Sequence, residues 1–235
     1  MKKEEWRDGF KAIIPVCISY FPIGLACGVL LQQAGFNSIA VLLMSLLVYG
    51  GASQFMIASM TISGVGFIEI VLMVFFINLR HLLMSSTIAG HLKNKSNLFN
   101  LAFAQSITDE SYAVNMMKFK IDPSWTANKA MTAGVATYVT WASSTTIGAL
   151  LGSSVSISTV VMNYMLTAMF IFLLVSQIEN WVLFWTTIFA MVSAVILKVV
   201  LKNGVAILIA SIIASLVGLG LANLKARKEE VVHES

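Results

Sequence analysis

The chain is dominated by apolar stretches of about 20 residues, the length that an α-helix needs to cross the hydrocarbon core of a bilayer. In lipid, a crossing segment must satisfy its own backbone hydrogen bonds, and segments of this length do so as helices. We therefore predict an all-α integral membrane protein, a polytopic helical bundle with about 7 to 8 transmembrane helices, some of them interrupted. The clearest spans are Phe10–Gln32, Ser38–Ile62, Phe67–Ala89, Lys129–Gly152, Ser158–Ile178, Trp181–Leu201 and Gly204–Leu224.

Composition excludes several other classes of protein. Hydrophobic residues make up 58% of the chain and charged residues 11%, values far from those of a soluble domain. The two cysteines, Cys17 and Cys27, share the first span and offer neither a disulfide framework nor a paired metal site. No HExxH, P-loop or GxSxG motif is present, so we expect no enzyme activity, no metal and no cofactor.

One further segment, Leu98–Lys118, is long enough to cross but carries Asp109 and Glu110 near its middle. The positive-inside rule offers a test, because cytoplasmic connections carry an excess of Lys and Arg. If the segment does not cross, the two termini fall on opposite sides and one basic cluster is misplaced. If it crosses and the N-terminus is cytoplasmic, the cytoplasmic side receives Lys2, Lys3, Arg7, Lys11, Lys118, Lys120, Lys129, Lys225, Arg227 and Lys228, and the other side receives Lys93, Lys95, Lys198 and Lys202.

We therefore predict eight crossings in the cell inner (cytoplasmic) membrane, with both termini cytoplasmic. The basic residues are scattered at the ends of spans, so the isoelectric point near 9.1 indicates orientation in a bilayer and no nucleic-acid partner. Residues 1–224 form a single transmembrane domain in this interpretation, and residues 225–235 a charged cytoplasmic tail.

A faint internal similarity links "PIGLACG", Pro22–Gly28, with "TIGALLG", Thr146–Gly152. Transporters are often built from repeats, and this similarity suggests a duplication of 10–118 and 128–224. The alternative is that both are small-residue motifs for close helix packing.

Weak helix formers and polar residues gather in the first two spans. Proline removes a backbone N–H, and each glycine costs a helix roughly 1 kcal/mol relative to alanine, so these spans are suited to local interruption. Non-helical backbone at membrane depth is tolerated where it lines a cavity or is buried in protein. Close packing with Gln54 bonded across to a neighbour is the alternative. The residues concerned are Pro22, Gly24, Gly50, Gly51, Ser53 and Gln54.

The third span contains "NLRHLLMSS", with Asn78, Arg80 and His81. An arginine at mid-membrane costs about 2.5 to 3.5 kcal/mol, so Arg80 needs a partner or a polar cavity, unless it reaches the interface. At 100° per residue, Asn78 and His81 share a face that Arg80 does not. The sequence therefore predicts either two polar environments around this helix or a helix that is broken here.

Asp109 and Glu110 are the obvious counterions for Arg80. In a continuous helix, Gln105, Asp109 and Tyr112 lie on one face, at spacings of four and seven residues. The alternative places this segment on the surface with both acids in water. Pairing with Arg80 leads us to predict one coupled unit beside the interrupted turn at Gly50–Gln54.

At these residues the sequence resembles the AzlC-type branched-chain amino acid permeases, the azaleucine resistance family. The matching pieces are "PIGLACG", "YGGASQF", "NLRHLLMSS" and "TDESYAV", which cover the first half closely, whereas the second half matches mostly in hydropathy. Many relatives carry an Asp in a "GLDFA"-like segment, where this chain has Asn163 in "VVMNYMLTAMF". Ion coupling through that position is therefore in doubt.

The resemblance implies the large subunit of a transporter that exports branched-chain amino acids on the proton gradient. The implied partners are a small AzlD-type membrane subunit, the lipid bilayer, the amino acid substrate and, for an oligomer, further copies. A pore or scaffold subunit with a structural polar cluster is the alternative. The candidate substrate-binding or coupling residues are Pro22, Gly24, Gly50, Gly51, Ser53, Gln54, Asn78, Arg80, His81, Gln105, Asp109, Glu110 and Asn163.

Overall fold

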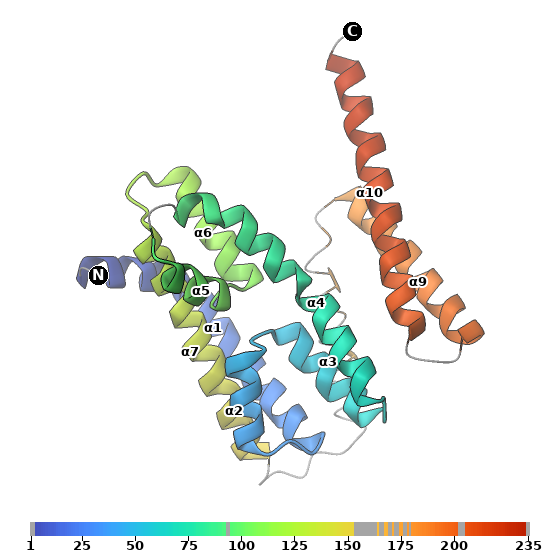
Figure 1. Ribbon diagram of the computed structural model, residues 1–235, viewed down its shortest axis with the longest axis horizontal. Coiled ribbons are helices and arrows are strands. Elements are labelled where there is room, and N and C mark those ends of the chain that lie inside the picture. Colours follow the sequence, from blue (N-terminus) through green and yellow to red (C-terminus); the bar gives the residue numbers. More distant parts are fainter. Residues whose placement is uncertain are drawn as a thin grey trace. The chain divides into compact units, whose positions relative to one another are not determined.

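A computed structural model describes residues 3–92, 95–152, 180–201 and 205–233, with single positions between 164 and 178 (Figure 1). Every regular element in these ranges is helical, which confirms the all-α membrane class. The chain divides into two compact units, residues 1–157 and 158–235, each of which is described by itself. Most of the predicted span Ser158–Ile178 lies outside the described residues, and so does Asn163.

The first unit contains two long helices that run side by side in the same direction, α1 (Lys3–Gln33) and α7 (Ala127–Gly152) (Figure 1). A Cβ on Gly9 would lie 2.8 Å from Thr132 Cβ, and one on Gly152 would lie 3.2 Å from Val29 Cα. Residues therefore meet in the same order along both helices. We call the end where α1 and α7 begin the proximal end, and the end where they finish the distal end.

Glycines allow this close approach. A Cβ on Gly28 would overlap the carbonyl oxygen of Thr145, and one on Gly148 would overlap that of Leu25. The similar motifs at Pro22–Gly28 and Thr146–Gly152 thus pack against each other, as the packing interpretation of these motifs expects. They supply an internal contact and give no support for a partner protein.

Helix α1 is continuous although Pro15 and Pro22 lie inside it. The local interruption predicted at Pro22 and Gly24 is therefore wrong. A proline removes one backbone bond, and here α7 packs along the same stretch, with Ser144 directly against Gly24.

The predicted span Ser38–Ile62 is broken into α2 (Ser38–Leu47) and α3 (Gly51–Ile62). This confirms the predicted interruption beside Gly50. The connection Val48–Gly50 contains Tyr49 at φ 42°, a left-handed conformation that non-glycine residues seldom adopt. The two helices form a broken hairpin, which we call hairpin 1.

Hairpin 1 begins and ends at the distal end. It follows the end of α1 directly, and it leads after four residues into α4 (Phe67–Ile88), which continues as the short 3₁₀ helix η1 (Ala89–Leu92). The far end of α4 packs in one core cluster with the start of α7, through Ile88, Leu92, Ala127 and Ala130. Helix α4 therefore starts at the distal end, where α3 must finish.

A second broken hairpin, hairpin 2, enters from the opposite end and consists of α5 (Asn97–Gln105) and α6 (Asp109–Ile121). Before α5, Lys95 Nζ donates to Asn128 Oδ1 at 2.8 Å, and Asn128 in turn donates to Glu5. Late in α6, the Phe119 ring stacks on His91 at 4.3 Å. Both ends of hairpin 2 therefore lie at the proximal end.

The prediction that Leu98–Lys118 crosses the membrane is therefore wrong. The segment is interrupted at Ser106–Thr108, where Thr108 caps a new helix. The Thr108 and Ser111 side chains each bond to the other residue's backbone, which is a capping box. A fresh helix start in mid-segment allows the chain to turn back.

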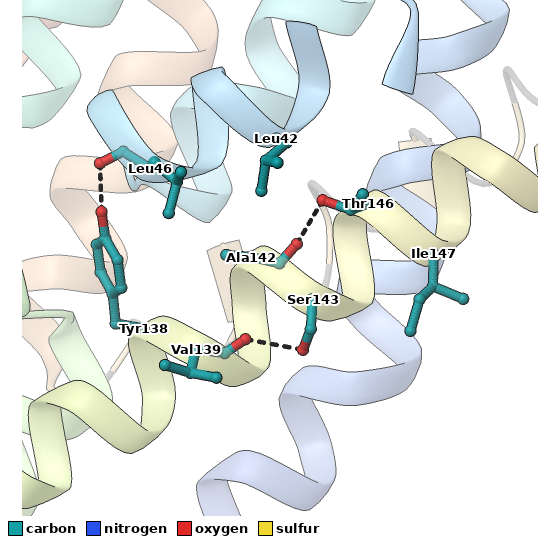
Figure 2. A pocket seen from close by; sticks show the side chains of 8 residues that line it. All are labelled: Leu42, Leu46, Tyr138, Val139, Ala142, Ser143, Thr146 and Ile147. Atoms are coloured by element: carbon teal, nitrogen blue, oxygen red, sulfur yellow. Dashed lines mark hydrogen bonds between the residues drawn. The ribbon is translucent and has the colours of Figure 1, made fainter. Parts of the chain in front are cut away.

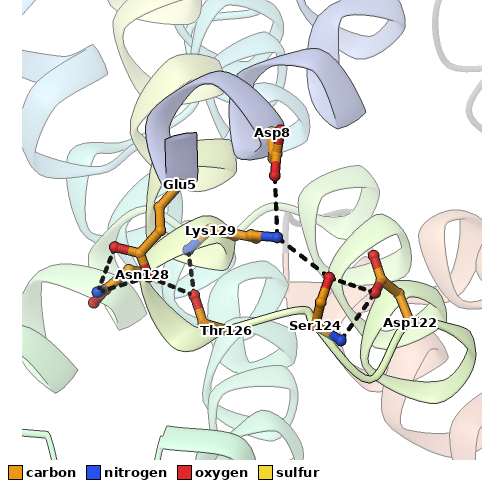
Figure 3. A network of polar contacts seen from close by, with 7 residues as sticks. All are labelled: Glu5, Asp8, Asp122, Ser124, Thr126, Asn128 and Lys129. Carbon is orange, nitrogen blue, oxygen red and sulfur yellow. Dashed lines mark hydrogen bonds and ion pairs between the residues drawn. The ribbon is translucent and has the colours of Figure 1, made fainter. Parts of the chain in front are cut away.

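A polar network joins the elements of the proximal end (Figure 3). Lys129 Nζ lies 3.1 Å from Asp8, and Glu5 accepts from Thr126 and Asn128. In the connection after α6, the hydroxyl and amide of Ser124 donate to Asp122, which lowers the pKa of the Asp122 carboxyl.

The second unit contains α9 (Trp181–Leu201) and α10 (Val205–His233), which pack against each other. Gly218 of α10 faces Thr186 of α9, where a Cβ would lie 2.8 Å from Thr186 Cγ2. Three helices in the described ranges are long and apolar enough to cross a membrane, and they are Glu4–Gln33, Phe67–Leu92 and Trp181–Val200.

Candidate functional site

The tips of the two hairpins meet. The side-chain amide of Gln105, the last residue of α5, donates to the carbonyl oxygens of Leu46 and Leu47 at 3.1 and 3.3 Å. The Tyr138 hydroxyl of α7 donates to the same Leu46 oxygen at 2.5 Å (Figure 2). The last carbonyls of a helix lack intrahelical partners, so these donors complete the interrupted end of α2.

The lengths of α2 and α5 indicate that the tips lie near the middle of a membrane. With 10 residues, α2 reaches about 15 Å, and with 9 residues α5 reaches about 14 Å. Each length is about half of a hydrocarbon core of about 30 Å. The two interruptions therefore fall at a depth where loosened backbone must be buried or line a cavity.

Each tip also presents the N-terminus of its second helix, with a serine in the same place. The Ser53 hydroxyl donates to the Gly50 carbonyl at 2.8 Å, and the Ser111 hydroxyl donates to the Thr108 carbonyl at 3.3 Å. The difference lies in capping, because Thr108 caps α6 with its side chain and Gly50 gives α3 no side-chain cap. A helix N-terminus attracts negative charge.

Arg80 of α4 forms an ion pair with Asp109, the first residue of α6. Its Nη1 lies 2.7 Å from Asp109 Oδ2, with 29% and 49% of the two side chains exposed. The predicted counterion is therefore in place, and the guanidinium points to the tip of hairpin 2. Arg80 Nε is buried and bonds to no other group in the part of the chain that the structure describes.

Glu110 has a different partner from the one predicted. Its carboxylate accepts a hydrogen bond from the hydroxyl of Tyr20 on α1, whose side chain is buried. The Tyr20 ring meets Trp141 of α7 edge to face, with centroids 5.4 Å apart. The two adjacent acids are thus bound to different helices, and only Asp109 is an ion-pair partner of Arg80.

Gln54 belongs to a buried hydrogen-bonded chain. Trp141 Nε1 donates to Gln54 Oε1 at 2.5 Å, and Gln54 Nε2 donates to Ser45 Oγ at 2.8 Å. Ser45 is bonded in turn to Thr145 of α7 at 2.8 Å. Each of these groups has a protein partner, so the geometry favours the structural interpretation of Gln54, in which it binds both halves of hairpin 1 to α7.

Asn78 lies against the other tip. A Cβ on Gly50 would lie 3.0 Å from Asn78 Oδ1, so the glycine leaves room for this oxygen. The oxygen is buried and has no hydrogen-bond partner within the described ranges. Helix α4 is continuous through this cluster, with Asn78 toward hairpin 1 and Arg80 toward hairpin 2. His81 is partly buried on α4 beside Arg80.

The remaining candidates are placed elsewhere. Gln105 does not share a helical face with Asp109, because the interruption at Ser106–Thr108 separates them. Gly51 packs against the Trp141 ring, where a Cβ would lie 3.2 Å from it. Pro22 and Gly24 belong to continuous α1.

Sequence reasoning missed the aromatic residues of the site, Tyr20, Tyr49, Tyr138 and Trp141. Each has an apolar ring and one polar atom, which suits a site where one side is dry and the other polar. Their positions inside apolar spans could have identified them from the sequence, because a buried hydroxyl or indole N–H needs a hydrogen-bond partner.

An open apolar pocket of about 440 Å³ lies at the surface between α2 and α7 (Figure 2). Its two small hydroxyl groups are already bonded to the backbone of their own helix. Ser143 donates to Val139 O and Thr146 donates to Ala142 O, each at 2.7 Å. The pocket therefore offers little hydrogen bonding and suits a hydrocarbon group. Its lining consists of Leu42, Leu46, Tyr138, Val139, Ala142, Ser143, Thr146 and Ile147.

The sequence profile of the family described as "AzlC protein" matches residues 15–155, which include both hairpins and α7. The chain belongs to the AzlC family. The resemblance drawn from the sequence motifs is therefore confirmed.

Known AzlC-like relatives are membrane proteins by name. An "Uncharacterized membrane protein" of Archaeoglobus fulgidus is 30% identical over 183 residues, covering 76% of this chain and 78% of the relative. "Inner membrane protein YgaZ" of Escherichia coli K12 is 28% identical over 63% of this chain and 61% of its own length. "Branched-chain amino acid transport protein AzlC" of Bacillus subtilis 168 is 23% identical over 73% of this chain and 67% of its own length. No solved structure matches.

Within the described residues, no group of three His, Cys, Asp or Glu side chains could hold a metal ion. The site contains instead the Arg80–Asp109 ion pair and Glu110 bonded to Tyr20. It also contains two buried atoms without a partner in the described residues, the acceptor Asn78 Oδ1 and the donor Arg80 Nε. These groups can bind a small polar or zwitterionic molecule by charge and hydrogen bonds.

Proposed function

We propose that the chain is the large subunit of a secondary transporter that exports branched-chain amino acids across the cytoplasmic membrane. It acts with a small AzlD-type membrane partner and uses the proton gradient. The observation that carries this proposal is the meeting of two oppositely directed broken hairpins at mid-membrane depth around Arg80 and Asp109. Transporters commonly bind substrates at such interruptions.

The groups at the tips match what a zwitterionic amino acid requires. Its carboxylate needs donors, which the uncapped start of α3 at Gly50 and the unpaired Nε of Arg80 supply. Its ammonium needs acceptors, which Asp109 and the unpaired Asn78 Oδ1 supply. The rings of Tyr20 and Trp141 provide an apolar wall for the side chain.

The family assignment supports the substrate class, since the Bacillus subtilis relative is named for branched-chain amino acid transport. The competing proposal, a scaffold subunit that transports nothing, has support from the bonded chain through Gln54, which stabilises contacts between helices. Transport assays are needed to separate the two.

The test is flux of radiolabelled leucine in proteoliposomes that contain the purified chain with its small partner. We expect a pH gradient that is acid inside to drive leucine accumulation by inside-out protein, with isoleucine and valine competing and lysine not competing. Liposomes without protein are the control. Absence of leucine flux from correctly folded complex would favour the scaffold. Full activity of the chain alone would remove the requirement for a partner.

A further inference from the structure

The two adjacent acids at the start of α6 have unequal surroundings. Asp109 is 2.7 Å from the guanidinium of Arg80, a permanent cation. Glu110 accepts from the neutral hydroxyl of Tyr20, and no cation pairs with it in the described part of the chain. Their positions in the sequence do not distinguish them, whereas their partners do.

We propose that Glu110 carries the proton whose movement is coupled to transport, whereas Asp109 is a fixed anion held by Arg80. This assignment rests on the proposed transport function and divides the roles of two acids that the sequence presents as one pair.

The titratable and charged groups around Glu110 come from several elements. Tyr20 of α1 donates its hydroxyl to Glu110, whereas Tyr49 of the hairpin 1 connection acts on it only through its charge state and donates its own hydroxyl to Thr137. Asp109 precedes it on α6, and Arg80 and His81 face that residue from α4. The charge of Arg80 is already matched by Asp109. Glu110 is therefore the acid whose charge has no counterion in this group.

The bond to Tyr20 persists in both protonation states of Glu110. When Glu110 is ionised, the tyrosine hydroxyl donates to the carboxylate. When Glu110 binds a proton from water, the carboxylic acid can donate and the tyrosine oxygen can accept. Asp109 lacks this freedom, because its protonation would leave Arg80 without its anion at membrane depth, which is costly.

A chain of contacts leads from Glu110 to the other hairpin. Tyr20 meets the edge of Trp141, and the indole N–H of Trp141 is bonded to Gln54 on α3. A change of charge at the tip of hairpin 2 thus acts on side chains that hold hairpin 1. This connection is what coupling between proton and substrate requires, because both must bias the same structural element.

The experiment compares Glu110→Gln with Asp109→Asn in leucine-loaded proteoliposomes of the complete complex. For E110Q we expect accumulation driven by the pH gradient to be lost, and leucine–leucine exchange to fall much less than accumulation. The pH dependence of exchange should also flatten. For D109N we expect exchange and accumulation to fall together. Glu69→Gln, at the distal start of α4, is the matched control and should behave as wild type.

Leucine-linked proton movement, followed with a pH-sensitive dye inside the vesicles, provides a second readout and should vanish in E110Q. If E110Q does not fold, Tyr20→Phe serves instead and should shift the pH profile of transport; an unchanged profile would overturn the assignment. Gradient-driven accumulation that survives in E110Q overturns the role of Glu110 alone. Absence of leucine flux in the wild type overturns the transport function and this assignment together.

Discussion

Gln105 of one broken hairpin donates its side-chain amide to the backbone oxygen of Leu46 in the other. The bond joins the last residue of α5 to the interrupted end of α2, so two hairpins that enter from opposite ends are fastened where they meet. Because Gln105 also reaches Leu47, one side chain donates to two carbonyls at the end of α2, and Tyr138 donates to one of them as well.

Replacing Gln105 by Ala should therefore weaken the contact between the hairpins. Each hydrogen bond lost at this exposed contact is worth about 0.5 to 1.5 kcal/mol, and Tyr138 still donates to Leu46 and limits the loss. Thermal unfolding of the purified complex measures this. Asn100→Ala on the same helix is the control, since its side-chain oxygen has no bond in the described part of the chain. Equal stability of the two variants would contradict the fastening role.

Arg80 and Asp109 should show strong energetic coupling. Leaving one charge of a fully buried pair unmatched costs roughly 3 to 5 kcal/mol, and partial exposure of these side chains should reduce that figure. We expect Arg80→Gln and Asp109→Asn each to lower folded yield, and the double variant to recover yield but not leucine efflux. A double variant that exports normally would place the substrate elsewhere, with Asn78 and His81 the next residues to test.

Gln54 should matter for stability and for the connection between the two hairpins. Its replacement by Leu leaves the Trp141 indole N–H and the Ser45 hydroxyl without their bonds, at roughly 1 to 3 kcal/mol for each unsatisfied group. We expect a lower melting temperature. Because the contacts from Tyr20 through Trp141 to α3 are interrupted, we also expect weaker leucine accumulation driven by the pH gradient. Trp141→Phe, which removes the same N–H, should be similar. A melting temperature and a gradient-driven accumulation equal to those of the wild type would contradict both roles.

The arrangement of the hairpins predicts which connections are accessible from the cytoplasm. The proximal end carries the basic residues of the first unit, whereas residues 34–66 contain no Lys or Arg, so the proximal end should be cytoplasmic. In a variant lacking Cys17 and Cys27, cysteines at Ser96 and Ser124 should resist an impermeant reagent added outside. A cysteine at Ser63 should react. Opposite behaviour of Ser96 and Ser124 would restore the crossing of Leu98–Lys118.

Much of this site could be predicted from charge and from helix-breaking residues. The pair Gly50 and Gly51 marked the interruption of hairpin 1, and the cost of a lone arginine pointed from Arg80 to Asp109. The break at Ser106–Thr108 was missed because it contains neither Gly nor Pro and depends on the capping of α6 by Thr108. The partner of Glu110 was missed because Tyr20 is 90 residues away in sequence.

Length alone could not distinguish a crossing helix from a hairpin. Both Ser38–Ile62 and Leu98–Lys118 contain enough residues for one crossing. The count of basic residues on each side tested only whether Leu98–Lys118 crosses, while Ser38–Ile62 was taken to cross. Two segments that each return the chain to the side from which it entered leave all later segments on the same sides as two segments that each cross. The count of basic residues therefore does not distinguish these two arrangements well. The distinction appears in contacts such as Lys95 to Asn128, which depend on tertiary structure.

Hairpins that enter from opposite ends also divide the thickness of the membrane. Their tips meet where Gln105 contacts Leu46 and Leu47. Moving one elementary charge across the whole membrane is worth about 2.3 kcal/mol per 100 mV of transmembrane voltage. A proton that Glu110 carries from one side to the other would gain this energy, so in the proposed transporter the voltage as well as the pH gradient should drive export.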